Sequence, residues 1–403
     1  MDPNRPQTQA GIPRRILPVI ILAVFMGTSP WFAGNAVLED LQRLWDLSPD
    51  ALAYVTSSVQ LGFIAGTLLF ALIGLSDAFS PRAVFLVCSL LVAASNAGIY
   101  LLADGFASLM TYRFLTGFFL AGIYPIGMRA VAGWYREGLG KAMGYLIAAV
   151  VLGTAFPHLL ESLGRTLSWT VVITTISVVA AMGGVLMYVL VPDGPYLTAG
   201  AKLERGALRR VFASKPLRAS AFGYFGHMWE LYAFWAFVPV LLTAHIGSGT
   251  AISLDIAFWS FVVIAAGSIG CAGGGVLSMR FGSAPLASVQ LAISGVCCII
   301  SPFLIDAPTG LFLLFLVVWG VTVAGDSPQF SSLNALNAPP GLVGSALTIV
   351  NCIGFSITIV SIQLLSFAGH YVDAHWLFPL LAAGPVAGLL AMRPLLRGRT
   401  ESA

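Results

Sequence analysis

The chain has 403 residues, of which 58% are hydrophobic and only 9% are charged, and its formal net charge is +3. Soluble domains carry about 25% charged residues, so this composition excludes a soluble globular protein. The apolar segments run for about 20 residues without two-residue alternation, which excludes a membrane β-barrel. An all-α membrane protein is the class that remains.

Hydropathy and helix-breaking residues predict twelve membrane-spanning helices. Their approximate ranges are 16–38, 50–74, 83–103, 106–128, 141–162, 168–191, 217–242, 255–277, 285–305, 309–332, 342–368 and 373–393. A polar segment with several Lys and Arg residues separates the first six from the last six. We therefore expect an N-terminal six-helix bundle (residues 1–191), a cytoplasmic linker (192–216) and a C-terminal six-helix bundle (217–403).

The distribution of charge predicts the orientation of these helices. If the N-terminus is cytoplasmic, 17 of the 20 Lys and Arg residues fall in inner segments. The positive-inside rule then places both termini in the cytoplasm of a multi-pass protein of the inner (plasma) membrane. The predicted outer loops are instead acidic and contain Glu39, Asp40, Asp46, Asp50, Asp104, Glu161, Asp306 and Asp373.

Helices four and ten share a pattern of small residues that indicates an internal repeat. The fourth span contains Gly117-x3-Ala121-Gly122-x2-Pro125, and the tenth contains Gly320-x3-Ala324-Gly325-x2-Pro328. The same helix of each six-helix half carries the match, so the pattern favours duplication and two pseudo-symmetric halves. Repeated halves with a binding site between them suit alternating access.

The seventh span contains Glu230 near its middle, where an ionisable side chain costs on the order of several kcal/mol unless it faces protein or a water-filled cavity. His227 precedes Glu230 by three residues, so the two side chains project about 60° apart on one helical face. The functional interpretation is a proton-responsive carboxylate beside an imidazole in a substrate path. The alternative is a packed ion pair or hydrogen-bonded plug that only joins helices.

Two further charges lie within predicted spans. Arg113 in the fourth span cannot lose its proton and must pair with an anion, a carboxylate or backbone carbonyls. It could attract an anionic substrate or pair with Glu230, or it could be a structural bridge. Asp326 in the tenth span is a second candidate for protonation, and nearby Pro328 predicts a bend that exposes polar groups. The alternative for Asp326 is an interfacial or gate-facing acid.

Several polar and aromatic side chains in the spans are candidates for contacting a substrate. The polar ones could equally form interhelical hydrogen bonds, and the aromatic ones could pack against neighbouring helices. The candidates are Asn35, Gln60, Asn351, Trp31, Tyr124 and Trp229, together with Arg113 and Glu230.

Three features occur together in this sequence. They are the short loop between spans two and three (Gly74-Leu75-Ser76-Asp77-Ala78-Phe79-Ser80-Pro81-Arg82), the pattern Arg113-x3-Gly117 in the fourth span, and the layout of six plus six spans. Together these features resemble the major facilitator superfamily over nearly the whole chain. The resemblance implies that Asp77 and Arg82 latch an inner gate and that Arg113 is tied to proton transfer. The alternative for the loop is a charge pair that only sets topology. Met279 stands where the matching loop of the second half would carry an acid, so a symmetric second latch is not expected.

Other function classes lack their motifs. The sequence has no Gly-rich phosphate loop with Lys-Ser/Thr and no recognisable catalytic constellation, so we expect neither ATP-driven transport nor an enzyme. The five cysteines lie in apolar spans without ligand spacing, which indicates packing rather than a metal site or disulfides. No catalytic residue, cofactor or metal is expected.

We therefore expect a secondary active transporter that moves one small solute by alternating access. Glu230, tuned by His227 and Arg113, is expected to bind and release the proton. Arg113 favours a small organic or inorganic anion carried by proton symport. The alternatives are a proton-coupled exporter of small amphipathic compounds and a non-transporting membrane receptor. The expected partners are a small-molecule substrate, protons and the lipid bilayer, without nucleic acid, and the chain is expected to be a monomer.

Overall fold

The computed structural model describes residues 12–163, 168–197, 206–247, 249 and 253–397, except for the side chains of Ser76 and Asp77. Part of the predicted linker, residues 198–205, lies outside the described residues. In the described chain, twelve helical spans are long and apolar enough to cross a membrane, which confirms the predicted number.

The first six spans begin with a broken helix and contain one other broken helix. They are α1 (Ile16–Thr28) continued by η1 (Ser29–Phe32) and α2 (Ala33–Ala36), α4 (Ala51–Ile73), α6 (Pro81–Leu101), α7 (Phe106–Leu120) continued by α8 (Tyr124–Trp134), α9 (Leu139–Leu163) and α10 (Trp169–Leu190). Short helices α3 (Leu38–Trp45) and α5 (Leu75–Ala78) lie in the connections.

The last six spans follow the short helix α11 (Ala207–Ala213). They are α12 (Lys215–Gly247), α13 (Ile256–Phe281), α14 (Ser283–Leu304), α15 (Thr309–Gly325) continued by α16 (Ser327–Asn337), α17 (Val343–Ala368), and η2 (Ala374–Trp376) with η3 (Phe378–Ala382) and α18 (Ala383–Arg397).

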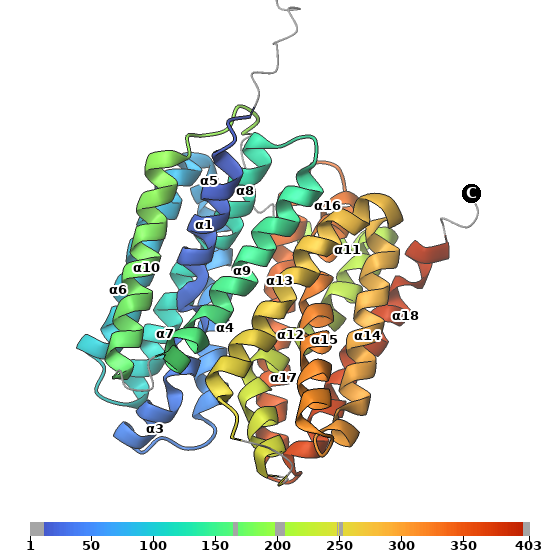
Figure 1. Cartoon of the computed structure of the whole chain (residues 1–403). Coiled ribbons are helices and arrows are strands. Elements are labelled where there is room, and N and C mark those ends of the chain that lie inside the picture. Colours follow the sequence, from blue (N-terminus) through green and yellow to red (C-terminus); the bar gives the residue numbers. More distant parts are fainter. Residues whose placement is uncertain (1–11, 164–167, 198–205, 248, 250–252, 398–403) are drawn as a thin grey trace, which may run out of the picture.

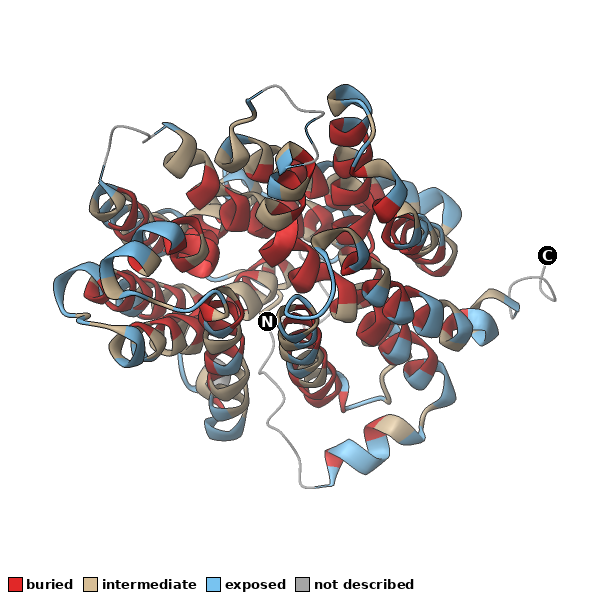
Figure 2. Cartoon of the chain, turned by 90° about the horizontal axis from the view of Figure 1, so that it is seen from below, coloured by how far each residue is buried: buried red, intermediate tan, exposed pale blue. Residues whose placement is uncertain are grey.

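The first six spans form one bundle and the last six form a second bundle beside it (Figure 1). Buried residues gather inside each bundle and between the two, whereas exposed residues lie on the outer faces of the helices (Figure 2). Many exposed side chains on those outer faces are large and apolar, including Leu69, Ile269 and Phe303. Apolar groups on this perimeter are in contact with lipid tails when the bundles span a bilayer.

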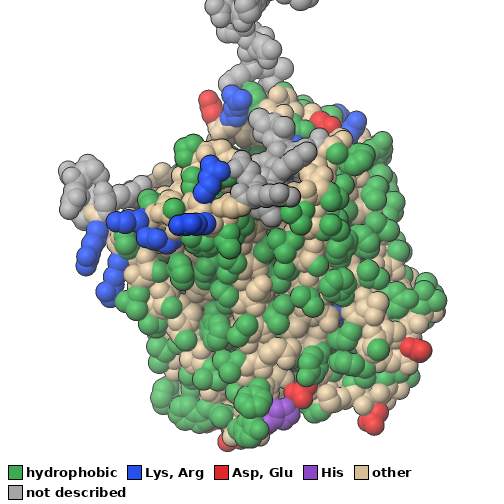
Figure 3. Space-filling model, turned by 180° about the vertical axis from the view of Figure 1, so that it is seen from behind, with side chains coloured by type: hydrophobic (Ala, Val, Ile, Leu, Met, Phe, Trp, Pro, Cys, Tyr) green, Lys and Arg blue, Asp and Glu red, His purple; other side chains and the backbone are tan. Residues whose placement is uncertain are grey.

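The two ends of the molecule differ in charge (Figure 3). At one end, here called the basic end, the helices begin or finish with Arg14, Arg15, Arg82, Arg136, Lys141, Lys215, Arg218, Arg280 and Arg393. The opposite end, here called the acidic end, carries Glu39, Asp40, Asp46, Asp50, Asp104, Glu161, Asp255, Asp306 and Asp373.

The internal repeat appears as matched breaks in helices four and ten. The fourth span is interrupted between Leu120 and Tyr124, and the tenth at Asp326. Both breaks fall within the repeated small-residue pattern and just before its proline, which cannot donate a backbone hydrogen bond to the preceding turn. The tenth helix is therefore interrupted two residues before Pro328, where the sequence predicts a bend.

The same pattern sets matched close approaches between helices. A Cβ atom added at Gly117 would lie 2.0 Å from the backbone oxygen of Val59, and one added at Gly320 would lie 2.0 Å from that of Val263. These contacts hold α7 against α4 in the first half and α15 against α13 in the second. Only glycine permits such backbone proximity, as in other membrane helix pairs.

Two glycines one turn apart on α13 test this packing. A Cβ at Gly270 would lie 2.0 Å from the backbone oxygen of Val321, whereas one at Gly273 would meet nothing within 4 Å. We expect Gly270→Ala to destabilise the protein by about 1–3 kcal/mol because α13 and α15 must separate. Gly273→Ala should leave stability unchanged or raise it by up to about 1 kcal/mol through helix propensity. Thermal denaturation of the two purified variants gives the comparison, and equal melting temperatures would contradict it.

The two halves meet mainly where α9 packs on α13 and α4 packs on α17. Towards the basic end, Gly144 of α9 lies against α13, with an added Cβ 3.0 Å from the Cα of Gly275. At the acidic end, the Ser162 hydroxyl donates to the Asp255 carboxylate at 2.8 Å. The interface is thus closed by helix contacts towards the basic end and by polar contacts at the acidic end.

Candidate functional site

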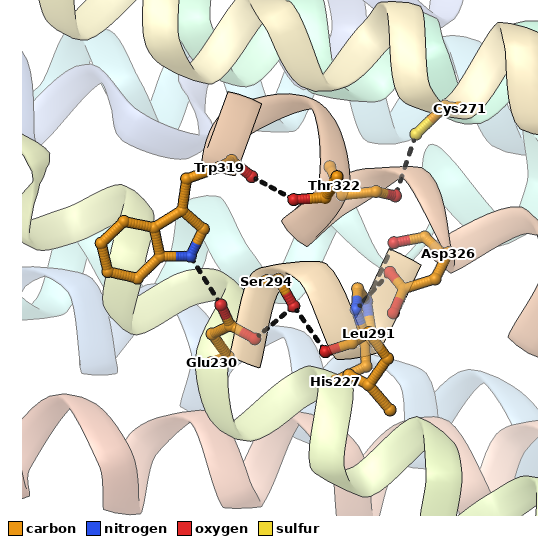
Figure 4. A network of polar contacts seen from close by, with 10 residues as sticks. His227, Glu230, Cys271, Leu291, Ser294, Trp319, Thr322 and Asp326 are labelled. Atoms are coloured by element: carbon orange, nitrogen blue, oxygen red, sulfur yellow. Dashed lines mark hydrogen bonds and ion pairs between the residues drawn. The ribbon is translucent and has the colours of Figure 1, made fainter. Parts of the chain in front are cut away.

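Glu230 lies on α12 with its carboxylate inside the second bundle, and its side chain is only 1% exposed (Figure 4). Three donors from neighbouring helices reach it. Ser294 Oγ on α14 donates at 2.9 Å, Cys298 Sγ on α14 at 3.3 Å, and Trp319 Nε1 on α15 at 2.7 Å. Among the described residues, Glu230 forms no salt bridge. The site therefore supplies hydrogen bonds to a carboxylate without supplying a counter-charge.

His227 has a different acidic partner from the one its spacing suggests. Its Nδ1 atom lies 2.8 Å from Asp326 Oδ1, although the approach is not aligned as a regular hydrogen bond, and its Nε2 atom is 2.9 Å from Ser327 Oγ. Asp326 and Ser327 lie at the break between α15 and α16, which turns their polar groups towards α12. His227 and Glu230 share a helix face in projection, but the neighbouring elements provide each with separate partners (Figure 4).

Arg113 is fully buried on α7 and binds the broken first span. Its Nη1 atom donates to the Pro30 carbonyl at 3.0 Å, and its Nη2 atom donates to the Trp31 carbonyl. Both carbonyls belong to the 3-10 turn η1, and the Pro30 carbonyl also accepts from the backbone N–H of Ala33. The sequence allows an anion, a carboxylate or backbone carbonyls as partners for Arg113, and the structure shows backbone carbonyls. It forms no salt bridge with a described acidic residue, and it does not contact Glu230.

Six aromatic side chains meet between the two halves, and we call them the interface aromatic cluster: Trp31, Phe32 and Phe63 from the first half, and Tyr232, Trp235 and Phe355 from the second. The Trp31 ring stacks on Tyr232 with centroids 5.8 Å apart and on Phe355 at the same separation. The Phe63 and Phe355 rings are 4.4 Å apart. The rings therefore form a continuous contact across the interface.

Buried polar atoms that have no hydrogen-bond partner among the described residues accompany this cluster. They include the indole nitrogens of Trp31 and Trp235, both amide atoms of Gln60, and Arg113 Nε. Gln60 lies on α4 one turn before Phe63, and Arg113 binds the backbone of Trp31. An unsatisfied buried donor costs about 1–3 kcal/mol, so a ligand with acceptor oxygens would gain from meeting these groups. All of them except the Gln60 oxygen are donors.

The helix α12 connects the buried acid to the cluster. Glu230 and Tyr232 are two residues apart, so their side chains project about 200° apart around the helix. The Glu230 face contacts α14 and α15, while the opposite face carries Tyr232 and Trp235 to the first half. If the contacts of α12 with α14 and α15 change, α12 can therefore move the aromatic side chains that it contributes to the interface between the halves.

The other candidate residues have mixed placements. Asn35 donates to Thr56 Oγ1 at 2.7 Å and so joins the first and second spans. Asn351 is half-buried on α17, one turn before Phe355 and on the same face. Tyr124 forms a hydrogen bond with Ser331 of the second half. Trp229 instead donates to the Leu380 carbonyl at 3.3 Å within its own half, and it is not part of the interface aromatic cluster.

The predicted inner latch is only partly visible. The Asp77 side chain lies outside the described residues, although its backbone belongs to α5. The Arg82 guanidinium lies over the ring of Tyr188 on α10, 5.4 Å from its centroid. Ser80 in the same loop donates to Asp193 at 2.8 Å. These contacts stay within the first half and the adjoining start of the linker, so the latch between halves remains a prediction.

Sequence reasoning missed the residues that hold Glu230. Ser294 and Cys298 are four residues apart on an apolar helix, which places a hydroxyl and a thiol on one face. That spacing was an available signal, whereas the contribution of Trp319 depends on how α15 packs. The cysteines were expected to serve only as small apolar residues, but Cys298 also donates to the buried carboxylate.

Twelve spans in two repeated bundles, with buried charges and an aromatic contact between them, define a secondary transporter rather than an enzyme. The family model of the Major Facilitator Superfamily matches residues 19–362, and the chain belongs to that superfamily. The sequence has no significant match among curated protein sequences.

Solved structures with the same fold are distant in sequence. The human organic anion transporter MFSD10 (TETRAN) is 16% identical, with a TM-score of 0.74 over 94% of this chain and 99% of that one. The proton:xylose symporter XylE, bound to 6-bromo-6-deoxy-D-glucose, is 14% identical, with a TM-score of 0.70 over 94% of each chain. A partially occluded inward-open form of XylE from E. coli gives a TM-score of 0.72 at 14% identity, over 94% of this chain and 98% of that one. At these identities the likeness shows the fold alone.

Proposed function

We propose that the protein is a proton-coupled carrier of small organic anions that works by alternating access. In this proposal the basic end faces the cytoplasm, in accord with the positive-inside rule, and the acidic end faces outward. The observation that carries the proposal is the arrangement of α12, which bears a buried acid on one face and part of the contact between the halves on the other.

The choice of an anion rests on Arg113. Its guanidinium remains charged, is fully buried and has carbonyl oxygens rather than a carboxylate as its described partners. A buried charge without a counter-ion is costly, and an anionic substrate bound beside Trp31 would reduce that cost. The unpartnered donors at Trp31, Trp235 and Gln60 support the same choice. The structurally similar MFSD10 (TETRAN) is an organic anion transporter, which agrees with this choice.

The choice of a proton as coupling ion rests on Glu230. Its carboxylate is buried with three donors and no described cation, so removing it from water favours the neutral acid while the donors make the ionised form attainable. Loss of the proton would tighten the hold of α14 and α15 on α12, and protonation would loosen it. His227 and Asp326 form a second titratable pair in the same half. The structurally similar XylE is a proton:xylose symporter, which agrees with this choice.

The interface aromatic cluster favours a substrate with a flat ring. When the halves separate on one side, the faces of Trp31, Tyr232 and Phe355 lose their stacking partners. A planar ring could restore that stacking, whereas a saturated ring of the same size could not, and a good aromatic pair is worth about 0.5–1.5 kcal/mol beyond area burial.

Benzenesulfonate and cyclohexanesulfonate test this substrate class because both stay charged at working pH and differ only in the ring. In proteoliposomes we expect an external acid pulse to drive uptake of benzenesulfonate about three- to tenfold faster than cyclohexanesulfonate. Trp31→Leu should remove this difference because the stacking surface is lost. Trp376→Leu, which alters an exposed tryptophan at the acidic end, is the control. Uptake of neither anion, or equal uptake of both, would reject the proposed substrate.

A further inference from the structure

The clearest polar contacts between the halves are at the acidic end, where α4 meets α17. Asp50, the residue immediately before α4, accepts a hydrogen bond from Ser366 Oγ at 2.8 Å. The same carboxylate oxygen is 2.9 Å from His370 Nε2, just beyond the end of α17. Two turns further along α4, Ser57 accepts a hydrogen bond from Gln363 at 2.9 Å. Opening the acidic end must break all of these contacts.

Asp50 occupies the N-cap position of α4 but does not cap its own helix. Its side chain accepts no hydrogen bond from the first turn of α4 and is directed to the other half instead. A capping aspartate normally has non-helical backbone angles and accepts from a free backbone N–H of the first turn. Asp50 instead has helical angles (φ −68°, ψ −10°), which do not suit that role, and its carboxylate serves the contact between the halves.

We propose that Asp50, Ser366 and His370 form an outer gate whose closure depends on pH. In the closed state Asp50 binds Ser366 and His370, and in the open state these contacts are broken. The Asp50 side chain is already 33% exposed, so water solvates the carboxylate once the halves part. The proposal concerns the closure of the acidic end, and it rests on the proposed function only in taking that end as the external one.

The pH window follows from the two titratable groups. The hydrogen bond from Ser366, together with His370, holds the pKa of Asp50 below its ordinary value. Ionised Asp50 therefore favours closure at pH values above the ordinary pKa of aspartate. This contribution is lost as the pH falls through the lowered pKa of Asp50. An imidazole is charged below about pH 6.5 and neutral above it. Closure should thus be strongest at about pH 4–6 and should weaken as pH rises towards 8.

Other charges near α4 have partners of their own or are distant. On α3, Arg43 pairs with Glu39 and Asp40, and on α7, Arg113 binds carbonyls. The helices α2 and α17 carry no charged side chain. On α12, His227 and Glu230 bind groups within the second bundle. His370 is the charged group that acts on Asp50 across the interface.

The chain also provides a matched control. His375 lies 3.2 Å from Asp306, also at the acidic end, but both residues belong to the second half. His158 and Glu161 are likewise paired on a single helix, α9. Among the His–acid pairs of the described residues, His370–Asp50 is the one that joins the two halves. Loss of His375 should therefore leave the gate unaffected.

The test is a distance measurement between the halves at the acidic end, made in nanodiscs without substrate or proton gradient. Spin labels at Leu44→Cys and Tyr371→Cys are suitable because both side chains are exposed and all five native cysteines are buried. We expect the closed-to-open ratio to fall roughly 1.5- to fivefold between pH 5.5 and pH 8. His370→Gln should remove this pH dependence, and His375→Gln should retain it.

Asp50→Ser gives a second, independent comparison, because serine caps a helix as well as aspartate but cannot pair with an imidazolium. This variant should fold normally, populate the open form more at pH 5.5 and lose the pH dependence. A distance distribution in the parent that does not change with pH would overturn the proposal. So would His370→Gln or Asp50→Ser with the parental pH response, or loss of that response in His375→Gln. Because no transport is measured, these outcomes are independent of Glu230, Arg113 and the substrate.

Discussion

Replacing Glu230 with glutamine is expected to abolish pH-driven accumulation of benzenesulfonate while sparing exchange of labelled for unlabelled anion. Glutamine preserves the size of the side chain, and its amide oxygen can accept from Trp319 while its NH2 group can donate to the Ser294 hydroxyl, but it cannot bind and release a proton. One proton carried inward with one monovalent anion moves no net charge, so the pH difference drives accumulation, and each pH unit provides about 1.4 kcal/mol, or roughly tenfold accumulation. The variant should lose this accumulation and approach equilibrium across the membrane.

The measurement compares uphill uptake with counterflow in the same proteoliposomes. Glu161→Gln is the control, because Glu161 also neighbours a histidine, His158 at 3.3 Å, but lies at the acidic end with its side chain 37% exposed. This control should accumulate the anion normally. If Glu230→Gln accumulates it as well, Glu230 is not the coupling group.

Trp319→Phe separates proton binding from a purely structural role of Glu230. Phenylalanine retains an aromatic ring beside Phe234 but removes the indole N–H that is 2.7 Å from the carboxylate. The ionised form of Glu230 loses a donor, so release of the proton becomes harder and the pH of half-maximal uptake should rise. A structural role alone predicts a lower rate at every pH with an unchanged midpoint.

Arg113→Gln is expected to raise the KM for benzenesulfonate by about tenfold or more. The change removes the positive charge proposed to attract the anion, and it removes charged hydrogen bonds to Pro30 and Trp31, each worth about 1.5–3 kcal/mol. Arg113→Lys should lie between the parent and Arg113→Gln, because lysine keeps the charge but lacks the planar fork that reaches two carbonyls.

Gly34→Ala displaces the same guanidinium without removing its charge. A Cβ atom at Gly34 would lie 2.8 Å from Arg113 Nε, so the arginine must shift. This variant should also raise the KM, whereas Arg43→Gln, at an exposed arginine of the acidic end, should not. Melting temperatures identify variants that fail to fold. If Arg113→Gln is stable and has the parental KM, the anion does not depend on Arg113.

The sequence alone determined the architecture, because crossing a bilayer requires long apolar helices whose backbone polar groups are satisfied internally. The twelve spans, the small-residue pattern shared by helices four and ten and an irregularity near Pro328 were predicted from patterns of a few residues, whereas the break in helix four was not predicted. The resemblance to the major facilitator superfamily was confirmed by the family match over residues 19–362. In each case the signal is local, since it depends on hydropathy, proline and glycine within one helix.

The partners of the buried charges were decided only by the tertiary structure. Helical spacing places His227 near Glu230, but the break at Asp326 brings that acid to His227, while Trp319 and Ser294 reach Glu230 from two other helices. Arg113 likewise binds carbonyls of the 3-10 turn that interrupts the first span after Thr28. The contact of Asp50 with His370 joins residues 320 positions apart. Such pairings depend on the rotation and depth of each helix against its neighbours, and hydropathy does not encode them.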